Sequence, residues 1–347
     1  MKSLKFLSAI FLAATIVSCG GKKNEEKNHF SLKIDAKTNR FQRNETVKVA
    51  IKNPENIQIA STKYYIGNKP VNVESGSIAL KDIPYGYQTI KAVVSYEDNS
   101  ETVTSKIEVL SETKPKIYSY TILNEYPHDI EAYTQGLEFY NDTLYESTGL
   151  RGKSSLRKVD YKTGEVLKKI DLNPKYFGEG ITILNNKIYQ LTWQSMVGFV
   201  YDVHTFEKEK TFSFVDSKEG WGLCNDGNNI YKSDGSEKLW TLDKDNLSET
   251  GYVQLVSHLA VQNKANELEY LDGLIYANTY LKDGIMMVDA KTGVIKGVVD
   301  CRGLKEKVTQ HKQLDVLNGI AYNPKTNTFF ITGKNWDKLF EVTFEEK

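Results

Sequence analysis

Apolar and polar residues alternate in short runs from residue 30 to about residue 110. A period of two residues is typical of β-strands that bury one face. The runs occupy residues 30–34, 47–51, 89–94 and 103–109, with turn residues between them. None of them has the spacing of an amphipathic helix. We therefore predict a small β-sandwich of the immunoglobulin-like kind over residues 30–112. It has no constellation of catalytic residue types, so a spacer or docking role is expected.

Beyond residue 113 one pattern occurs five times. Each copy places a polar or aromatic residue before Gly-Leu, Gly-Ile or, once, Glu-Leu, and continues as a strand, a turn of Asn, Asp or Gly, and a second strand. The apolar residues at positions 137, 181, 223, 268 and 320 are 44, 42, 45 and 52 residues apart. This is the period of a β-propeller blade. We predict an all-β chain with a five-bladed β-propeller over residues 113–347, and a short helical excursion at residues 303–314 in the longest step.

Two sets of repeat-equivalent positions are expected to face the central channel, because the innermost strand of each blade runs along it. The residues that begin the copies are Gln135, Glu179, Trp221, Asn266 and Asn318. The residues that follow the turn and second strand are Thr148, Trp193, Asp234, Tyr280 and Lys334. The scaffold repeats while these side chains differ in chemistry. That divergence indicates a functional site in the channel.

Glu179 is the candidate acid/base group of this site. It lies between two glycines, where the backbone can approach a ligand closely. Aromatic walls from Trp193, Trp221 and Tyr280 would form a small-molecule pocket and, by partly desolvating the carboxyl group, raise its pKa. Lys334 would lower it, and the sequence does not decide between the two effects. As a lone acid, Glu179 would instead be an ordinary solvated turn residue.

The N-terminus resembles a bacterial lipoprotein signal. Residues 1–18 carry two lysines before an apolar run and end just before Cys19, so we expect cleavage there and lipid attachment to Cys19. An ordinary signal peptide followed by a stray cysteine is the alternative. Gly20 is similar to the outer-membrane-sorted class, and residues 19–29 are a polar tether. We expect a lipid-anchored protein of the bacterial cell envelope, in the outer membrane, facing the periplasm or the exterior.

Charge and ligand-type residues exclude several classes of function. The chain has 45 basic and 45 acidic residues and no long basic tract, so nucleic acid is not an expected partner. Five scattered histidines and no Cys-x-x-Cys motif argue against a zinc site. Asp234-Gly235-Ser236 is more typical of a turn than of a calcium loop. Cys224 and Cys301 are expected to be buried thiols, with a bridge between them left open. We expect no metal and no cofactor.

Motifs in order and at consistent spacing resemble one known family, the plant-type glutaminyl cyclases, over residues 118–342. The motifs are Tyr133-Thr134-Gln135-Gly136-Leu137, Glu146-Ser147-Thr148-Gly149-Leu150, Tyr176-Phe177-Gly178-Glu179-Gly180-Ile181-Thr182, Leu191-Thr192-Trp193, Glu219-Gly220-Trp221-Gly222-Leu223, Ser233-Asp234-Gly235-Ser236, Asn266-Glu267-Leu268-Glu269-Tyr270, Val316-Leu317-Asn318-Gly319-Ile320-Ala321-Tyr322 and Thr332-Gly333-Lys334. The resemblance implies a five-bladed propeller. It also implies cyclisation of the N-terminal glutamine of peptides or proteins to pyroglutamate, with release of ammonia and without a metal.

The resemblance also implies roles for individual residues. The catalytic acid/base falls on Glu179, with polar partners at Gln135, Asn266 and Lys334. The expected substrate-binding residues are Tyr133, Phe177, Trp193, Trp221, Tyr280, Asp234 and Asn318. Tyr133 and Tyr280 stand where the family commonly has Phe and Trp, which predicts an altered substrate preference. The alternative function is a non-catalytic propeller that binds a peptide or carbohydrate in its channel.

Overall fold

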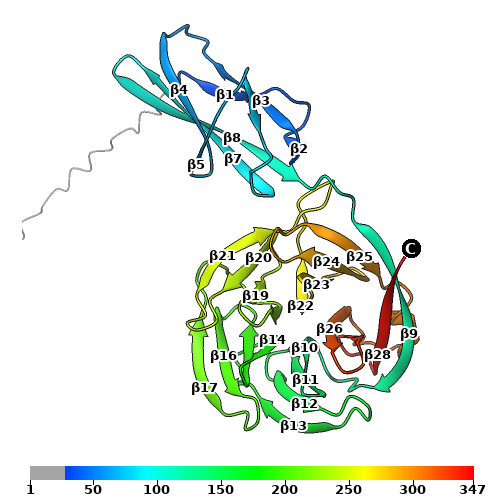
Figure 1. The fold of residues 1–347 in the computed structure, drawn as a ribbon. Coiled ribbons are helices and arrows are strands. Elements are labelled where there is room, and N and C mark those ends of the chain that lie inside the picture. The colour runs from blue at the N-terminus through cyan, green and yellow to red at the C-terminus, as the bar shows by residue number, and fades with distance from the viewer. Residues whose placement is uncertain (1–27) are drawn as a thin grey trace, which may run out of the picture.

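The computed structural model describes residues 28–347, whose regular secondary structure is β-strand apart from one short 3-10 turn (Figure 1). The expected signal peptide and Cys19 lie outside the described residues. The helical excursion expected at 303–314 is only a single 3-10 turn, η1 (Lys305–Lys307). No helix in residues 28–347 is long and apolar enough to span a bilayer.

Two sheets at the N-terminal end share one hydrophobic core. One sheet has the order β1 (Ser31–Ile34), β3 (Thr46–Lys52), β6 (Ser77–Ala79). The other has the order β2 (Arg40–Gln42), β8 (Asn99–Leu110), β7 (Gly86–Tyr96), β4 (Ile59–Ile66), β5 (Lys69–Val71). Val47 of β3, Ile78 of β6 and Ile90 of β7 are each no more than 1 % exposed in this core. The alternating sequence pattern therefore places its apolar residues between the two sheets.

The remaining strands form sheets arranged in a ring (Figure 1). Three four-stranded antiparallel sheets come first: β10 (Thr134–Tyr140), β11 (Thr143–Thr148), β12 (Ser155–Val159), β13 (Val166–Asp171); β14 (Gly178–Leu184), β15 (Lys187–Thr192), β16 (Val197–Asp202), β17 (Lys208–Ser213); β18 (Leu223–Asn225), β19 (Ile230–Ser233), β20 (Lys238–Leu242), β21 (Glu249–Gln254). An eight-stranded sheet completes the ring in the order β22 (Ala265–Leu271), β23 (Leu274–Thr279), β24 (Gly284–Asp289), β25 (Ile295–Asp300), β9 (Lys116–Pro127), β28 (Lys338–Glu346), β27 (Thr328–Gly333), β26 (Leu317–Asn323).

Strand β9 joins the two ends of the ring. It pairs in parallel with β25 and antiparallel with β28, so an early strand is hydrogen-bonded to the last one. At the centre, β10 packs on β14, β14 on β18, β18 on β22, β22 on β26, and β26 on β10. Hydrophobic cores lie between neighbouring sheets. The ring is thus closed both by its innermost strands and by the pairing of β9 with β28.

The hairpin turns expected from the repeats have the backbone conformation that their residues favour. Asn141, Asn185 and Asp272 have φ values of 49°, 54° and 50°. Asn and Asp tolerate this left-handed region better than other residues with a side chain. Each turn connects an innermost strand to the next strand outward, so the repeat pattern sets where each hairpin reverses.

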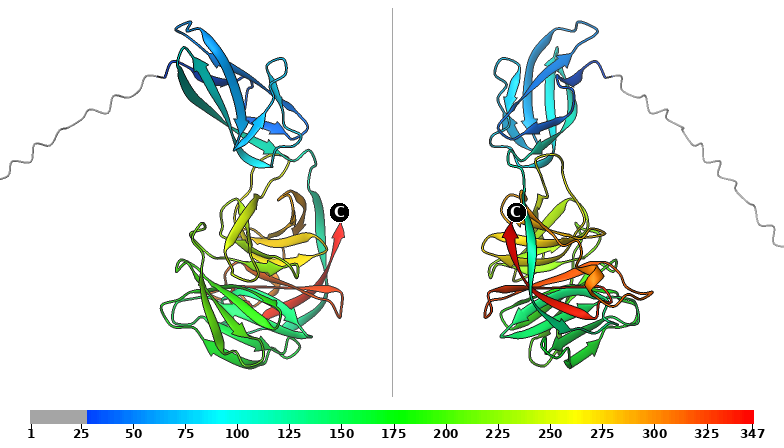
Figure 2. Two further views of the ribbon diagram at one scale, coloured as in Figure 1. Left: turned by 60° about the vertical axis from the view of Figure 1, so that its left-hand side comes forward. Right: turned by 90° about the vertical axis from the view of Figure 1, so that its right-hand side faces the viewer.

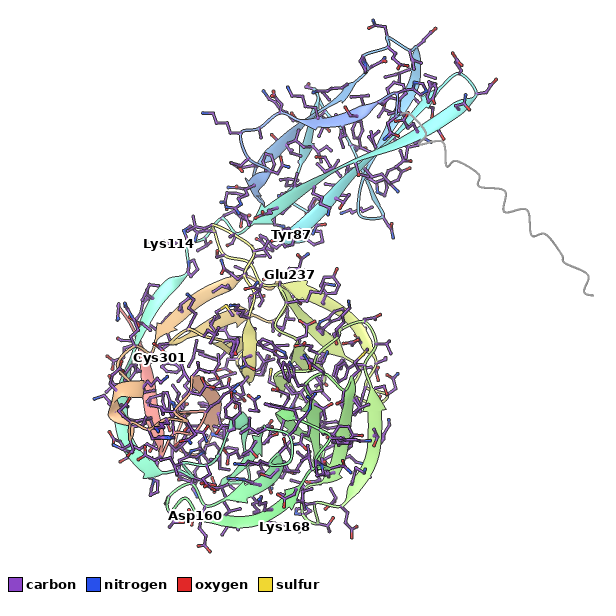
Figure 3. All side chains as sticks on the ribbon, turned by 180° about the vertical axis from the view of Figure 1, so that it is seen from behind. Tyr87, Lys114, Asp160, Lys168, Glu237 and Cys301 are labelled. Carbon is purple, nitrogen blue, oxygen red and sulfur yellow. The ribbon has the colours of Figure 1, made fainter. Side chains whose placement is uncertain are left out.

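The N-terminal sheets contact the edge of the ring near β21 (Figure 2). The side-chain amide of Gln254 accepts a hydrogen bond from the Tyr87 backbone N–H at 2.9 Å and donates one to the Tyr87 carbonyl at 3.3 Å. The Ser111 backbone N–H also donates to the carbonyl of Ser257 at 3.2 Å. Figure 3 shows Tyr87 and Glu237 at this junction, with Lys114 on the connection.

Both cysteines within the described residues are buried free thiols. Cys224 lies in the hydrophobic core between the β18–β21 sheet and strands β22–β25. Cys301 lies in a different core, which includes residues of β26, β27 and β28. Burial raises the pKa of each thiol. The open alternative of a disulfide between them is not realised in this structure.

Candidate active site

A pocket of about 180 Å³ lies among the innermost strands of the ring. Five aromatic and four polar or charged side chains line it: Tyr133, Phe177, Trp193, Trp221, Tyr280, Gln135, Glu179, Asn266 and Lys334. These residues come from all of the sheets that make up the ring. Aromatic walls with a few convergent polar groups are typical of a site for a small ligand or a single side chain.

Irregularities at the start of the innermost strands aim the polar residues into this pocket. The β10–β11 register shifts between Thr134 and Gly136, which frees Gln135 from the ladder. Equivalent shifts free Glu179 in β14 and Asn266 in β22. Bulges of this kind turn a side chain out of the regular alternation and are common beside active sites.

Glycine at the following position lets the innermost strands meet. A Cβ atom on Gly180 would lie 2.6 Å from the Gly222 Cα, and one on Gly222 would lie 2.1 Å from the carbonyl oxygen of Asn266. Because backbone atoms cannot yield as flexible side chains can, a residue larger than glycine would push the strands apart. The glycine after Glu179 therefore reflects contact between neighbouring backbones.

Glu179 is almost completely enclosed, with 4 % of its surface exposed. The Nε2 atom of Gln135 donates a hydrogen bond to Glu179 Oε1 at 2.9 Å. The Oε1 atom of Gln135 in turn accepts one from Asn318 Nδ2 at 3.1 Å. Burial raises the pKa of Glu179 well above its usual value, the charge of Lys334 opposes this shift, and the charge of Glu219 adds to it. A carboxyl group with a raised pKa can exchange protons closer to neutral pH than an ordinary one.

Lys334 contributes a basic side chain to the pocket that holds the acidic Glu179. Its Nζ atom lies 4.9 Å from the centre of the Tyr133 ring and 5.5 Å from that of Tyr280, a cation–π arrangement. Burial lowers the pKa of Lys334, although Glu179 and Asp315 raise it in part. No hydrogen bond from Nζ to a described residue holds this group, so its protons are available to a ligand.

The aromatic side chains contact one another around the pocket. The ring centroids of Tyr133 and Phe177 are 6.2 Å apart, those of Phe177 and Trp193 are 5.5 Å apart, and those of Trp221 and Tyr280 are 5.5 Å apart. All three contacts are edge-to-face, a favourable geometry for aromatic pairs. Two gaps interrupt this circuit, one between the tyrosines and one between the tryptophans.

Charged groups bridge both gaps. Lys334 lies between Tyr133 and Tyr280. The Oε2 atom of Glu219 accepts hydrogen bonds from the indole Nε1 atoms of Trp193 at 2.8 Å and Trp221 at 2.9 Å. The pocket wall is therefore a closed sequence of contacts.

Two of the expected substrate contacts do not line the pocket. Asp234 accepts a hydrogen bond from the Trp240 indole at 2.8 Å and belongs to a neighbouring hollow. A Cβ atom on Gly235 would lie 2.5 Å from the Trp221 ring, so Trp221 fills the space beside Asp234. Asn318 lies behind Gln135 and donates to it and, at 2.9 Å, to the Thr134 carbonyl. Asn318 thus orients Gln135 from outside the pocket.

Two residues that hold the pocket wall have no role that the sequence predicts. Glu219 belongs to the motif Glu219-Gly220-Trp221, but its position before Trp221 does not indicate that it also reaches Trp193. Asp315 accepts a hydrogen bond from the Tyr133 hydroxyl at 2.7 Å. Burial and this carboxylate raise the pKa of Tyr133. Asp315 directly precedes the motif that begins at Val316, so its position next to that motif is the signal that the sequence offers.

The described residues contain no cluster of metal-ligating side chains. No group of three or more His, Cys, Asp or Glu side chains in residues 28–347 is arranged to hold a metal ion.

The chain that carries this pocket is similar to proteins of one known family. Residues 92–344 match the family model described as glutamine cyclotransferase. The chain is 38% identical over 241 residues to a glutaminyl-peptide cyclotransferase of Arabidopsis thaliana, covering 67% of this chain and 73% of the relative. It also resembles the crystal structure of Myxococcus xanthus glutaminyl cyclase, with a TM-score of 0.63 and 32% identity over 67% of this chain and 100% of that one.

Proposed function

Because this enzyme belongs to the glutamine cyclotransferase family, we propose that its central pocket converts the N-terminal glutamine of peptides or proteins to pyroglutamate and releases ammonia. One observation carries the proposal for this chain. The buried carboxyl group of Glu179, with its raised pKa, is held by Gln135 inside an aromatic pocket of about 180 Å³. A pocket of this size suits one glutaminyl side chain better than a long stretch of peptide.

The proposed reaction is an intramolecular acyl transfer. The substrate α-amine attacks the carbon of the side-chain carboxamide, a C–N bond forms, and the bond to the amide nitrogen breaks. Glu179 accepts the proton that the amine loses and delivers it to the departing ammonia, so the carboxyl group ends in its starting state. Holding the side chain folded back on the amine supplies the proximity term, and proton transfer by a positioned carboxyl group supplies the acid/base term.

Lys334 and Asn266 are the proposed donors to the developing oxyanion. Both side chains line the pocket and neither is held by a hydrogen bond to a described residue. Their unused N–H groups can therefore turn to the substrate, and donors aimed at new negative charge stabilise it. Gln135 would hold the Glu179 carboxylate in position and use its second N–H for the substrate. These steps need only side chains, and we propose a metal-independent reaction.

We also propose a domain architecture for the chain. The cores between neighbouring sheets, the circle of innermost strands and the five sequence copies support a five-bladed β-propeller over residues 113–347. The two sheets around one core support an immunoglobulin-like sandwich over residues 30–112. The signal-like residues 1–18 and Cys19 support lipid anchoring in the bacterial envelope, with residues 19–29 as the tether.

Ammonia release from a Gln-initiated dipeptide amide tests the proposed function. The purified protein should release ammonia and produce pyroglutamyl peptide, while a Glu-initiated peptide of otherwise identical sequence serves as the specificity control. Chelator should leave the rate unchanged. Loss of the rate on chelation and its recovery with zinc would overturn the metal-independent mechanism. Binding of the Gln peptide without turnover would instead favour a non-catalytic binding module.

A further inference from the structure

We propose that Glu219 is a positioning residue that fixes the two indole walls of the glutamine pocket. This inference rests on the proposed function, because it concerns how the same pocket receives its substrate. Glu219 does not line the pocket. Its carboxylate lies behind the wall and faces a neighbouring hollow that Asp234 and Glu237 also line. It therefore acts on the substrate through Trp193 and Trp221.

The hydrogen bonds of Glu219 link two sheets of the ring. Trp193 follows β15 and Trp221 precedes β18, so the two indoles come from different sheets. Both indole N–H groups donate to the same oxygen, Oε2. The other oxygen, Oε1, accepts from Gln194 Nε2 at 3.2 Å. An indole has a single N–H donor, so this contact fixes the one polar handle of each ring.

The segment that carries Glu219 is itself anchored in the protein interior. Lys232 and Glu249 form an ion pair at 2.9 Å with side chains that are 0 % and 1 % exposed. Glu249 Oε2 also accepts the backbone N–H groups of Asp216 at 2.8 Å and Ser217 at 3.1 Å. Lys232 and Glu249 both hydrogen-bond the Ser217 hydroxyl. The backbone two residues before Glu219 is thus fixed.

Backbone hydrogen bonds continue this support on the other side of Glu219. The Gly220 N–H donates to the Trp193 carbonyl at 3.0 Å, and the Trp193 N–H donates to the Phe177 carbonyl at 3.1 Å. With its two flanks held, Glu219 can adopt few other positions. Its carboxylate is a preset acceptor, which is what a residue must be if it is to orient other side chains.

Removing this acceptor should loosen the wall on the tryptophan side. The circuit of contacts around the pocket has no direct contact between Trp193 and Trp221, and Glu219 supplies the link. Each indole would keep one edge-to-face partner, Phe177 or Tyr280, and would lose the hydrogen bond that sets its rotation. A wall that binds ground and transition states alike affects KM more than kcat.

The charge of Glu219 has a second, separable effect. Its negative charge adds to the elevation of the Glu179 pKa. A neutral residue that still accepts hydrogen bonds should preserve the wall but lower the pKa of Glu179. The acid limb of the kcat–pH profile should then move to lower pH. A residue with only a structural role would not move this limb.

Three variants of the full chain separate these effects. Glu219→Ala removes both the acceptor and the charge, and Glu219→Gln removes the charge but retains a carbonyl oxygen with two lone pairs. Glu237→Ala is the matched control, because it removes a neighbouring carboxylate that makes no hydrogen bond to either indole. Gln-peptide kinetics across pH and the near-ultraviolet circular dichroism of the indoles are measured for each variant.

Glu219→Ala should raise KM about tenfold, as expected for loss of hydrogen bonds to a charged group, with a smaller change in kcat and an altered indole spectrum. Glu219→Gln should keep KM and the spectrum close to wild type and shift the acid limb downward. Unchanged KM and spectrum in Glu219→Ala, or equal changes in Glu237→Ala, would overturn the proposal. If wild type releases no ammonia, the proposed function fails, whereas the spectra still decide whether Glu219 holds the indoles.

Discussion

Glu179 and Lys334 have opposite pKa shifts for one reason, which is burial. Burial favours the neutral form of each group, so it raises the pKa of Glu179 and lowers that of Lys334. Each charge partly restores the ionised state of the other. A carboxyl group that both gains and loses a proton in one reaction cycle works best with a pKa near the working pH. The enclosure of the pocket thus prepares Glu179 for the proposed proton transfer.

The proposed roles of Glu179 and Trp193 predict different kinetic defects. Glu179→Gln keeps the size of the side chain but cannot carry a proton, so kcat should fall by about 10² to 10⁴-fold while substrate still binds. Trp193→Ala removes an apolar wall and should raise KM more than it lowers kcat. Steady-state ammonia release with a Gln peptide measures both. A near-native kcat for Glu179→Gln, or one shared pattern in the two variants, would contradict this division of roles.

At the scale of strands, the repeat pattern was sufficient to predict much of the site. The residues that begin four of the copies, Gln135, Glu179, Trp221 and Asn266, line the pocket. Each lies at or just before the start of an innermost strand. The fifth, Asn318, does not line it. Repeat spacing gives the level of a residue along the channel, but it does not give the rotation of its side chain.

The second set of repeat positions illustrates the same limit. Trp193, Tyr280 and Lys334 line the pocket, whereas Thr148 and Asp234 do not. The Thr148 hydroxyl is hydrogen-bonded to that of Ser155 at 2.8 Å. Asp234 is instead satisfied by the Trp240 indole, while Trp221 packs over the adjacent Gly235. Competition between a local hydrogen bond and a neighbouring aromatic ring depends on three-dimensional packing, so the sequence could not settle it. The N-terminal strands were easier to predict because alternation depends only on local pattern.

Glu267 stands where the other copies have glycine, and it predicts a pH dependence of stability. Its carboxylate is 0 % exposed and accepts backbone N–H groups from Leu137 at 3.2 Å and Ile320 at 2.7 Å. Burial raises its pKa well above 4.5, while those two N–H groups lower it in part. A carboxyl group with a raised pKa in the folded state binds more protons there than in the unfolded state. Its contribution to stability is therefore fully present below pH 4.5 and is lost as pH rises from there through the raised pKa of the folded state.

Glu267→Gln should remove this dependence, because an amide does not titrate. The difference in Tm between wild type and Glu267→Gln should therefore shift in favour of the variant between pH 5 and pH 8. Comparing the two proteins by thermal unfolding cancels the titrating groups that do not interact with Glu267. Glu269 and Glu138 do interact with it, so the measured shift includes their response. A Tm difference that is constant with pH, or that favours wild type more at pH 8, would show that the pKa of Glu267 is not raised in the folded state.

At the scale of the whole molecule, the N-terminal sheets are joined to the ring without entering the pocket. No residue from 28 to 132 lines it. The junction is nevertheless close in sequence to the pocket. Gln254 and Ser257, which contact the N-terminal sheets, and the pocket residue Asn266 are separated only by the connection between β21 and β22. The contacts with Tyr87 and Ser111 hold the outer end of that loop. We therefore regard the N-terminal sheets as a support that is separate from the proposed chemistry.

Deleting residues 20–112 should leave kcat and KM for a Gln peptide within a few-fold of wild type. Far-ultraviolet circular dichroism establishes that the shortened protein is folded. Gln254→Ala in the full chain is the companion variant, because it breaks the hydrogen bonds to Tyr87 without removing any strand. If the shortened protein is folded but inactive, the N-terminal sheets complete the site, and the proposed boundary near residue 112 is wrong.

The pairing of β9 with β28 also determines when the ring can close as the chain is synthesised. Strand β9 leaves the ribosome before every other strand of the ring, yet its antiparallel partner is translated only after β27. Lys334 lies in the same late segment, so a nascent chain that has already made Glu179 still lacks the cation that faces it. Local hairpins can form early, because they need only neighbouring residues. The proposed site therefore becomes complete only when the last segment of the chain has been made and β28 has paired with β9.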